Sequence, residues 1–239
     1  MVSRPGGDRK SRATFADYRR AAHEAAGKLP RLAIAHGESE FLRREALQTF
    51  RDAWMVMYPG GDTASIRGSG EGRSVSIADL TRELSGGSLF GGDKLVLARQ
   101  AEKLLFSGHG AAEGASGASE RDHRFLEAAE SVPPRVWLFL DCASLPQNRT
   151  AGKRLAAAGF LIPCPSLSQR EVPAWLAERA ERLGKTLDSA AADMLARAHG
   201  ADLGVLAGEM EKLAVYAGDT RAIDAETVGG FMTGSVEFD

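Results

Sequence analysis

The residues best placed to bind a phosphate lie in the turn His36-Gly-Glu-Ser-Glu-Phe41, between an expected strand and an expected helix. A P-loop at such a turn needs the pattern G-x-x-x-x-G-K-[ST], because backbone N–H groups and a lysine must surround the phosphates. The turn has one glycine, no lysine and two carboxylates, Glu38 and Glu40, which would repel a triphosphate. The segment Gly87–Lys94 also fails, because Asp93 occupies the lysine position and a strand follows the segment instead of preceding it. The sequence therefore predicts no P-loop.

An acidic residue that could hold the Mg²⁺ of a bound nucleotide is also missing from its usual place. The apolar strand Leu95-Val-Leu-Ala98 runs into Arg99-Gln100, and neither side chain suits that ion. Asp141 ends another apolar strand, but Cys142 follows it and no P-loop accompanies it. Active ATP hydrolysis is therefore disfavoured.

Other catalytic and metal-binding patterns are absent from the sequence. It contains no H-E-x-x-H or G-x-S-x-G motif, and its five histidines are scattered: His23, His36, His109, His123 and His199. His36 could pair with Asp141 if their strands are neighbours, although a hydrogen-bonded structural histidine is the favoured interpretation. The two cysteines, Cys142 and Cys164, cannot by themselves form a disulfide framework or a tetrahedral metal site. Each ends or follows an apolar run, so both are expected to be buried.

Two surface features could bind a macromolecule. Arg149, Lys153 and Arg154 form a basic helix start that could contact a phosphate backbone, although a solvated face is the default interpretation. Ser88-Leu89-Phe90 places two large apolar residues between Gly86-Gly87 and Gly91-Gly92, on an expected turn. These residues either fold back onto the sheet or form a wedge that fills a pocket on a partner.

Strands that alternate with helices must position these residues. Such alternation predicts a parallel sheet with helices on both faces. Glycine-rich stretches at 59–74 and 107–120 are expected to be loops, the first with one short strand. Strands are expected at 31–36, 94–98, 136–140 and 160–162, and helices at 14–26, 39–54, 76–86, 121–130 and 150–158.

The pattern changes after Pro165, where only helices are expected. Ser168–Glu171 has capping-box spacing, and Asp188, Asp202 and Asp224 can each cap a later helix. We therefore predict a disordered tail over 1–12, an α/β domain over 13–166 and a small all-α domain over 167–239.

Composition narrows the class of protein. The chain has 239 residues, with 30 Lys and Arg against 32 Asp and Glu and a net charge of −2. A near-neutral charge argues against a protein that grips nucleic acid by bulk electrostatics. No apolar run reaches the ~18–20 residues of a membrane span, and the N-terminus does not resemble a secretory signal, so a cytoplasmic location is expected.

Five segments in order resemble the delta subunit of bacterial DNA polymerase III, a clamp-loader subunit. They extend over about residues 15–235, and no single motif among them is diagnostic. The segments are Ala35–Leu42, Ser88-Leu-Phe90 with Lys94–Leu104, Val136–Leu140, Gln169–Trp175, and Ala201-Asp-Leu203 through Gly208–Tyr216.

The resemblance implies an AAA+-like (P-loop-NTPase-like) α/β domain with a degenerate nucleotide site, followed by a helical lid domain. It implies that Leu89 and Phe90 enter a pocket of the ring-shaped sliding clamp and help to open it. Catalysis and cofactors are not expected in this chain. ATP would be used by other clamp-loader subunits of the polymerase complex, through which the chain would meet DNA, and no membrane is involved.

The resemblance also implies a third, collar domain that would assemble the loader, whereas the chain stops at Asp239, about where that domain would begin. A truncated chain and a natural short form both remain open.

Two other functions are alternatives to clamp binding. An active AAA+ ATPase requires the missing phosphate-binding and acidic residues, and a nucleic-acid-binding module would use Arg149, Lys153 and Arg154.

Overall fold

The computed structural model describes residues 13–68, 77–86, 92–105, 120–148 and 150–235, which form two compact units divided between Pro165 and Ser166. The first unit contains a five-stranded sheet in the order β2-β3-β4-β1-β5, with every neighbouring pair parallel. Its strands are β1 (Leu32–His36), β2 (Asp62–Arg67), β3 (Lys94–Arg99), β4 (Val136–Cys142) and β5 (Phe160–Pro163). The expected parallel sheet with flanking helices is confirmed.

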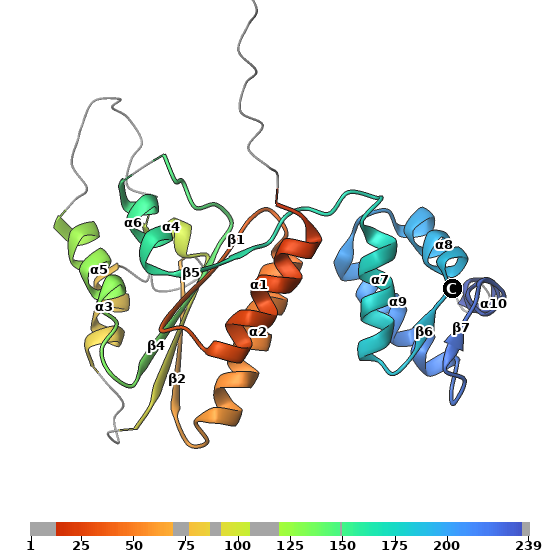
Figure 1. The fold of residues 1–239 in the computed structure, drawn as a ribbon, viewed down its shortest axis with the longest axis horizontal. Helices are drawn as coiled ribbons and strands as arrows, with labels where there is room; N and C mark the ends of the chain where they lie inside the picture. Colours follow the sequence, from red (N-terminus) through yellow and green to blue (C-terminus); the bar gives the residue numbers. More distant parts are fainter. Residues whose placement is uncertain (1–12, 69–76, 87–91, 106–119, 149, 236–239) are drawn as a thin grey trace, which may run out of the picture. The chain divides into compact units, whose positions relative to one another are not determined.

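Helices cover both faces of this sheet, with α1 and α2 on one face and α3, α5 and α6 on the other (Figure 1). The central strands β1 and β4 are apolar along most of their length because both faces are buried. The helices are α1 (Phe15–Lys28), α2 (Glu40–Met57), α3 (Ile77–Ser85), α4 (Ala101–Leu105), α5 (Glu120–Glu130) and α6 (Thr150–Ala158). The short helix α4 was not expected from the sequence.

Successive residues of each strand point to opposite faces of the sheet and pack into two separate hydrophobic cores. Ile34, Val96 and Leu138 point toward α3 and α5, where they join Leu80 and Phe125 in one buried cluster. The intervening strand residues face α1 and α2, and Phe139 of β4 packs against Phe50 of α2 with ring centroids 5.2 Å apart. The strand period of two therefore decides which helix each side chain of the sheet can meet.

The second unit is mainly helical, as expected, and the structure adds one short pair of parallel strands. Each strand has two residues, which is too short to give a period in the sequence. Asp188, Asp202 and Asp224 accept hydrogen bonds from the backbone N–H groups of the helices that follow them, as their positions predicted. The elements are α7 (Val172–Arg182), β6 (Thr186–Leu187), α8 (Ser189–His199), α9 (Leu203–Tyr216), β7 (Ala222–Ile223) and α10 (Ala225–Ser235).

The expected capping box at Ser168 forms a turn that precedes the helix. The N–H and Oγ of Ser168 donate to the Glu171 carboxylate at 2.9 and 2.7 Å, but α7 begins only at Val172. Pro173 lies in the first turn of α7, where a missing N–H costs nothing.

Candidate functional site

The turn between β1 and α2 lies where a P-loop would lie, and it rests directly on the ends of the neighbouring strands. The N–H of Gly37 donates to the carbonyl of Cys142 at 3.2 Å, and the N–H of Ser39 donates to the carbonyl of Cys164 at 3.2 Å. These two N–H groups are therefore occupied by the protein's own backbone. Ser39 also caps α2, since its Oγ accepts the N–H of Leu42 at 3.3 Å.

Gly37 makes this close approach possible. Its φ is +140°, and a Cβ atom built on it would lie 2.1 Å from the Cys164 carbonyl oxygen. A side chain is excluded by both the backbone conformation and the contact. The backbone of this turn thus packs directly against the end of β5 and leaves no room there for a ligand, whereas the backbone of a P-loop surrounds a phosphate.

A buried ion pair also contacts this turn, from the interior of the protein. Arg43 of α2 donates from Nε to Oδ1 of Asp141 at the end of β4, over 2.6 Å, and from its terminal nitrogen to the carbonyl oxygen of Gly37. The Arg43 and Asp141 side chains are only 7% and 10% exposed. The guanidinium therefore links α2, the β1 turn and β4 inside the protein.

His36 does not pair with Asp141, so that possibility is wrong. Their strands are neighbours, but Asp141 lies opposite Ala35 and His36 lies opposite Cys142, so the two side chains leave opposite faces of the sheet. Burial lowers the pKa of His36 below its ordinary value. No hydrogen bond of the imidazole to another described residue is found, which differs from the expected hydrogen-bonded histidine.

The end of β3 carries no acidic residue that could hold an ion. Arg99 ends the strand, and Gln100 follows with φ +53°. Glu102 of α4 instead accepts the N–H of Ala143 at 2.9 Å, beyond the end of β4. Among the described residues, no group of three or more His, Cys, Asp or Glu residues could hold a metal ion.

Both cysteines lie buried at this edge of the sheet, as expected. Cys142 ends β4 and Cys164 follows β5, and neither forms a disulfide. Burial raises the pKa of both thiols far above the ordinary value, so neither is a reactive thiolate.

The connection between α3 and β3 enters the sheet at the opposite edge, the amino edge, where the strands begin. We call Asp93 and Lys94, with their hydrogen-bond partners, the base of this connection. Lys94, the first residue of β3, is 8% exposed, and its Nζ donates to the carbonyl oxygen of Glu83 at 2.9 Å and to the Glu83 carboxylate at 2.8 Å. Asp93 accepts two hydrogen bonds from Arg135, both 3.2 Å long. Leu89 and Phe90 themselves lie outside the described residues, within 87–91.

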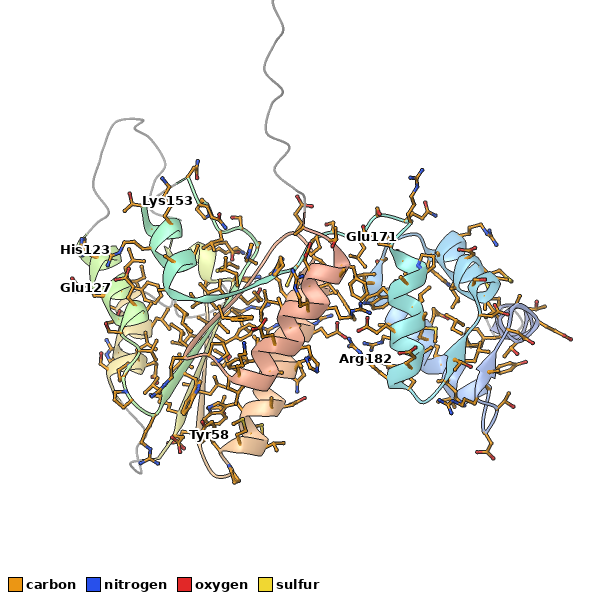
Figure 2. All side chains as sticks on the ribbon, in the orientation of Figure 1. Tyr58, His123, Glu127, Lys153, Glu171 and Arg182 are labelled. Atoms are coloured by element: carbon orange, nitrogen blue, oxygen red, sulfur yellow. The ribbon has the colours of Figure 1, made fainter. Side chains whose placement is uncertain are left out.

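Of the three basic residues expected to contact a phosphate backbone, the structure describes Lys153 and Arg154 of α6. Arg154 makes two hydrogen bonds to the Glu130 carboxylate, at 2.6 and 2.7 Å, which lower the pKa of Glu130. Lys153 is exposed on the surface of α6 (Figure 2), and Arg149 lies outside the described residues.

Sequence reasoning missed the roles of Arg43 and Lys94. Arg43 had a signal, because it interrupts the apolar stripe of α2 while Asp141 is the only charged residue of β4. A lone charge on each of two adjacent buried surfaces indicates an internal ion pair. The sequence signal for Lys94 was weaker, since this lysine stands directly before the apolar run Leu95–Ala98 of β3.

Comparisons with known proteins extend this picture. A family model described as a middle domain matches residues 168–229. No curated protein matches the chain. No helix of the described residues is long and apolar enough to span a membrane.

Solved structures that are similar to the chain include a clamp-loader protein and a branch migration motor. The Bacillus subtilis DNA clamp loader delta protein has a TM-score of 0.65 and 15% identity, over 90% of this chain and 61% of that one. The Thermotoga maritima RuvB Holliday junction branch migration motor has a TM-score of 0.51 and 12% identity, over 92% of this chain and 67% of that one. At such identities the likeness shows the fold, an AAA+-like α/β unit followed by a helical region.

Proposed function

We propose that this chain is a clamp-loader delta-type subunit, which binds the ring-shaped DNA sliding clamp through Leu89 and Phe90 and helps to open it without hydrolysing ATP. One observation carries the proposal. The two ends of the connection that bears Leu89 and Phe90 are fixed by the Lys94–Glu83 and Arg135–Asp93 contacts. Anchored ends suit a binding element, because the residues that border the apolar segment need not be ordered when a partner binds.

The closed turn at the other edge of the sheet supports the non-catalytic part of the proposal. Gly37 and Ser39 donate their N–H groups to strand carbonyls, and Arg43 and Asp141 satisfy each other. A triphosphate would have to displace these contacts and would then meet Glu38 and Glu40. ATP hydrolysis is accordingly assigned to partner subunits of the loader, and this chain needs no cofactor.

The likeness to the B. subtilis clamp loader delta protein supports the choice of partner. This chain spans 61% of the length of that protein, so the assembly of a complete loader is part of the proposal as well. The other proposed partners are the remaining clamp-loader subunits, with DNA reached through the polymerase III complex.

The proposed mechanism is differential binding. Burying Leu89 and Phe90 in a clamp pocket contributes roughly 1.5–3 kcal/mol for each side chain. This free energy promotes ring opening only to the extent that the open or relaxed ring accepts the two side chains better than the closed ring does.

Calorimetric titration of the chain into its cognate sliding clamp tests the proposal. We expect binding by the wild type and its loss in the Leu89→Ala/Phe90→Ala double variant. Val205→Ala/Val215→Ala is a matched control, because both valines are exposed on α9, at 44% and 81%. Circular dichroism establishes that both variants are folded.

The titration can also refute the proposal. No binding by the wild type at tens of micromolar would remove clamp binding as the function of this chain. ATP binding by the isolated chain, with hydrolysis above a blank, would favour an active AAA+ ATPase instead. Tight, strongly salt-dependent binding to DNA alone would favour a nucleic-acid-binding module, although the Arg154 guanidinium already binds Glu130.

A further inference from the structure

Three consecutive apolar side chains are exposed at the end of α2. Met55, Val56 and Met57 are 48%, 82% and 54% exposed, and they are the exposed large hydrophobic residues of the described α/β unit. They lie in an uncharged run between Asp52 and Asp62. Isolated exposed apolar residues are common on soluble proteins, but a consecutive group within an uncharged run is typical of an interaction surface.

The last turn of α2 is anchored on both sides of this group, which keeps the backbone of the three residues at the surface. Trp54 is fully buried, and its ring centroid lies 6.0 Å from that of Trp137 and 5.6 Å from that of Tyr58. Tyr58 in turn packs on Trp137 at 4.3 Å. Because the residues on both sides of the group are anchored in one aromatic cluster, the group is fixed in its exposed position.

This group lies at the amino edge of the sheet, next to the base of the α3–β3 connection. The N–H of Asp62 donates to the carbonyl oxygen of Asp93 at 2.8 Å. Gly61 fits between Trp54 and Asp93, since a Cβ built on it would lie 2.4 Å from the Trp54 ring and 3.0 Å from the Asp93 carbonyl oxygen. The chain that leaves α2 thus reaches Asp93, the residue that accepts the Arg135 hydrogen bonds, through Gly61 and Asp62.

We propose that Met55, Val56 and Met57 form a second apolar contact for the sliding clamp. This inference rests on the proposed function, because the partner is chosen from the contact of Asp62, shortly after α2, with Asp93 in the connection that bears Leu89 and Phe90. A surface without charge fits an apolar area of the clamp. Two methionines suit such a contact, since their flexible side chains adapt to the shape of a partner.

The chain offers a matched pair of variants to test this contact. Val56 and Val215 are the penultimate residues of α2 and α9, and they are 82% and 81% exposed. Val56→Gln and Val215→Gln therefore make the same change, without a change of charge, at equivalent helix positions. Calorimetric titration into the cognate clamp is expected to show affinity about tenfold lower for Val56→Gln, and unchanged for Val215→Gln.

The outcomes separate this second contact from the proposed function. If the wild type binds and Leu89→Ala/Phe90→Ala does not, while Val56→Gln binds like the wild type, the second contact is wrong and the proposed function stands. If the wild type does not bind the clamp, both are wrong. Sedimentation of the chain alone adds a further test, because self-association that is abolished by Val56→Gln would assign this surface to a second copy of the chain and overturn the proposal.

Discussion

Each edge of the sheet holds a buried cation paired with a carboxylate, but the surroundings of the two pairs differ. At the carboxyl edge a buried cation, Arg43, pairs with Asp141 and closes the turn where ligands of α/β proteins usually bind. At the amino edge a buried cation, Lys94, pairs with Glu83 at the base of a connection that carries Leu89 and Phe90, next to exposed apolar residues of α2. In this unit the turn at the carboxyl edge is therefore closed, whereas exposed apolar side chains lie near the amino edge.

The comparison predicts that Asp141→Ala destabilises the protein more than any other single substitution at the two edges. The change leaves the Arg43 guanidinium buried without its carboxylate, which typically costs about 3–5 kcal/mol. Urea unfolding monitored by circular dichroism measures the free energy of unfolding. A loss below about 1 kcal/mol would contradict a buried ion pair and would place these side chains in solvent.

The double variant Arg43→Met/Asp141→Leu is the control for that experiment. It removes both charges while keeping apolar volume in the site, and such replacements are often neutral or stabilising. We expect it to be more stable than Asp141→Ala alone. Thiol labelling of Cys142 gives an independent measure, since the buried thiol should react with a disulfide reagent only when this edge opens.

Gly37→Ala should have the next largest effect. A Cβ at 2.1 Å from the Cys164 carbonyl oxygen forces the turn away from β5, and a positive φ costs a further ~1–3 kcal/mol for a residue with a side chain. The same measurement of urea unfolding applies. Gly184→Ala is the control, because Gly184 has φ +74° but nothing within 4 Å of its Cβ position, so it separates conformational strain from the close contact.

Lys94→Ala tests the amino edge and should cost less, about 1–2 kcal/mol, because Glu83 is 41% exposed and water can replace the ammonium group. Its effect on clamp affinity should exceed its effect on stability, since it frees the base of the α3–β3 connection. Arg154→Ala, which breaks the exposed Glu130 pair, should change neither quantity appreciably. Equal clamp affinities for Lys94→Ala and the wild type would remove the anchoring role.

Much of this contrast between the edges could be predicted from the sequence. Apolar runs such as Val136–Leu140 identified the strands, and the pattern after His36 predicted a turn without the glycines and lysine of a P-loop. The ion pairs could not be predicted, because Arg43 and Asp141 are 98 residues apart and meet only after the sheet order is known. The contact of Arg154 with Glu130 could not be predicted either, because the two residues lie on different helices.

The effect of pH should be the smallest, and it reports on the carboxyl edge alone. Burial lowers the pKa of His36 in the folded protein, so the folded state resists protonation of the imidazole that the unfolded state accepts below about pH 6.5. The contribution of His36 is therefore fully present above pH 6.5 and is lost as the pH falls toward the lowered pKa. The free energy of unfolding of the wild type should decline more steeply between pH 7.5 and 5 than that of His36→Gln, and parallel curves would mean that the imidazole is protonated as readily in the folded protein as in the unfolded chain. His36 lies at the opposite edge from the base of the α3–β3 connection, so His36→Gln should change clamp affinity little. The stability of the carboxyl edge would then depend on pH while clamp binding at the amino edge would not.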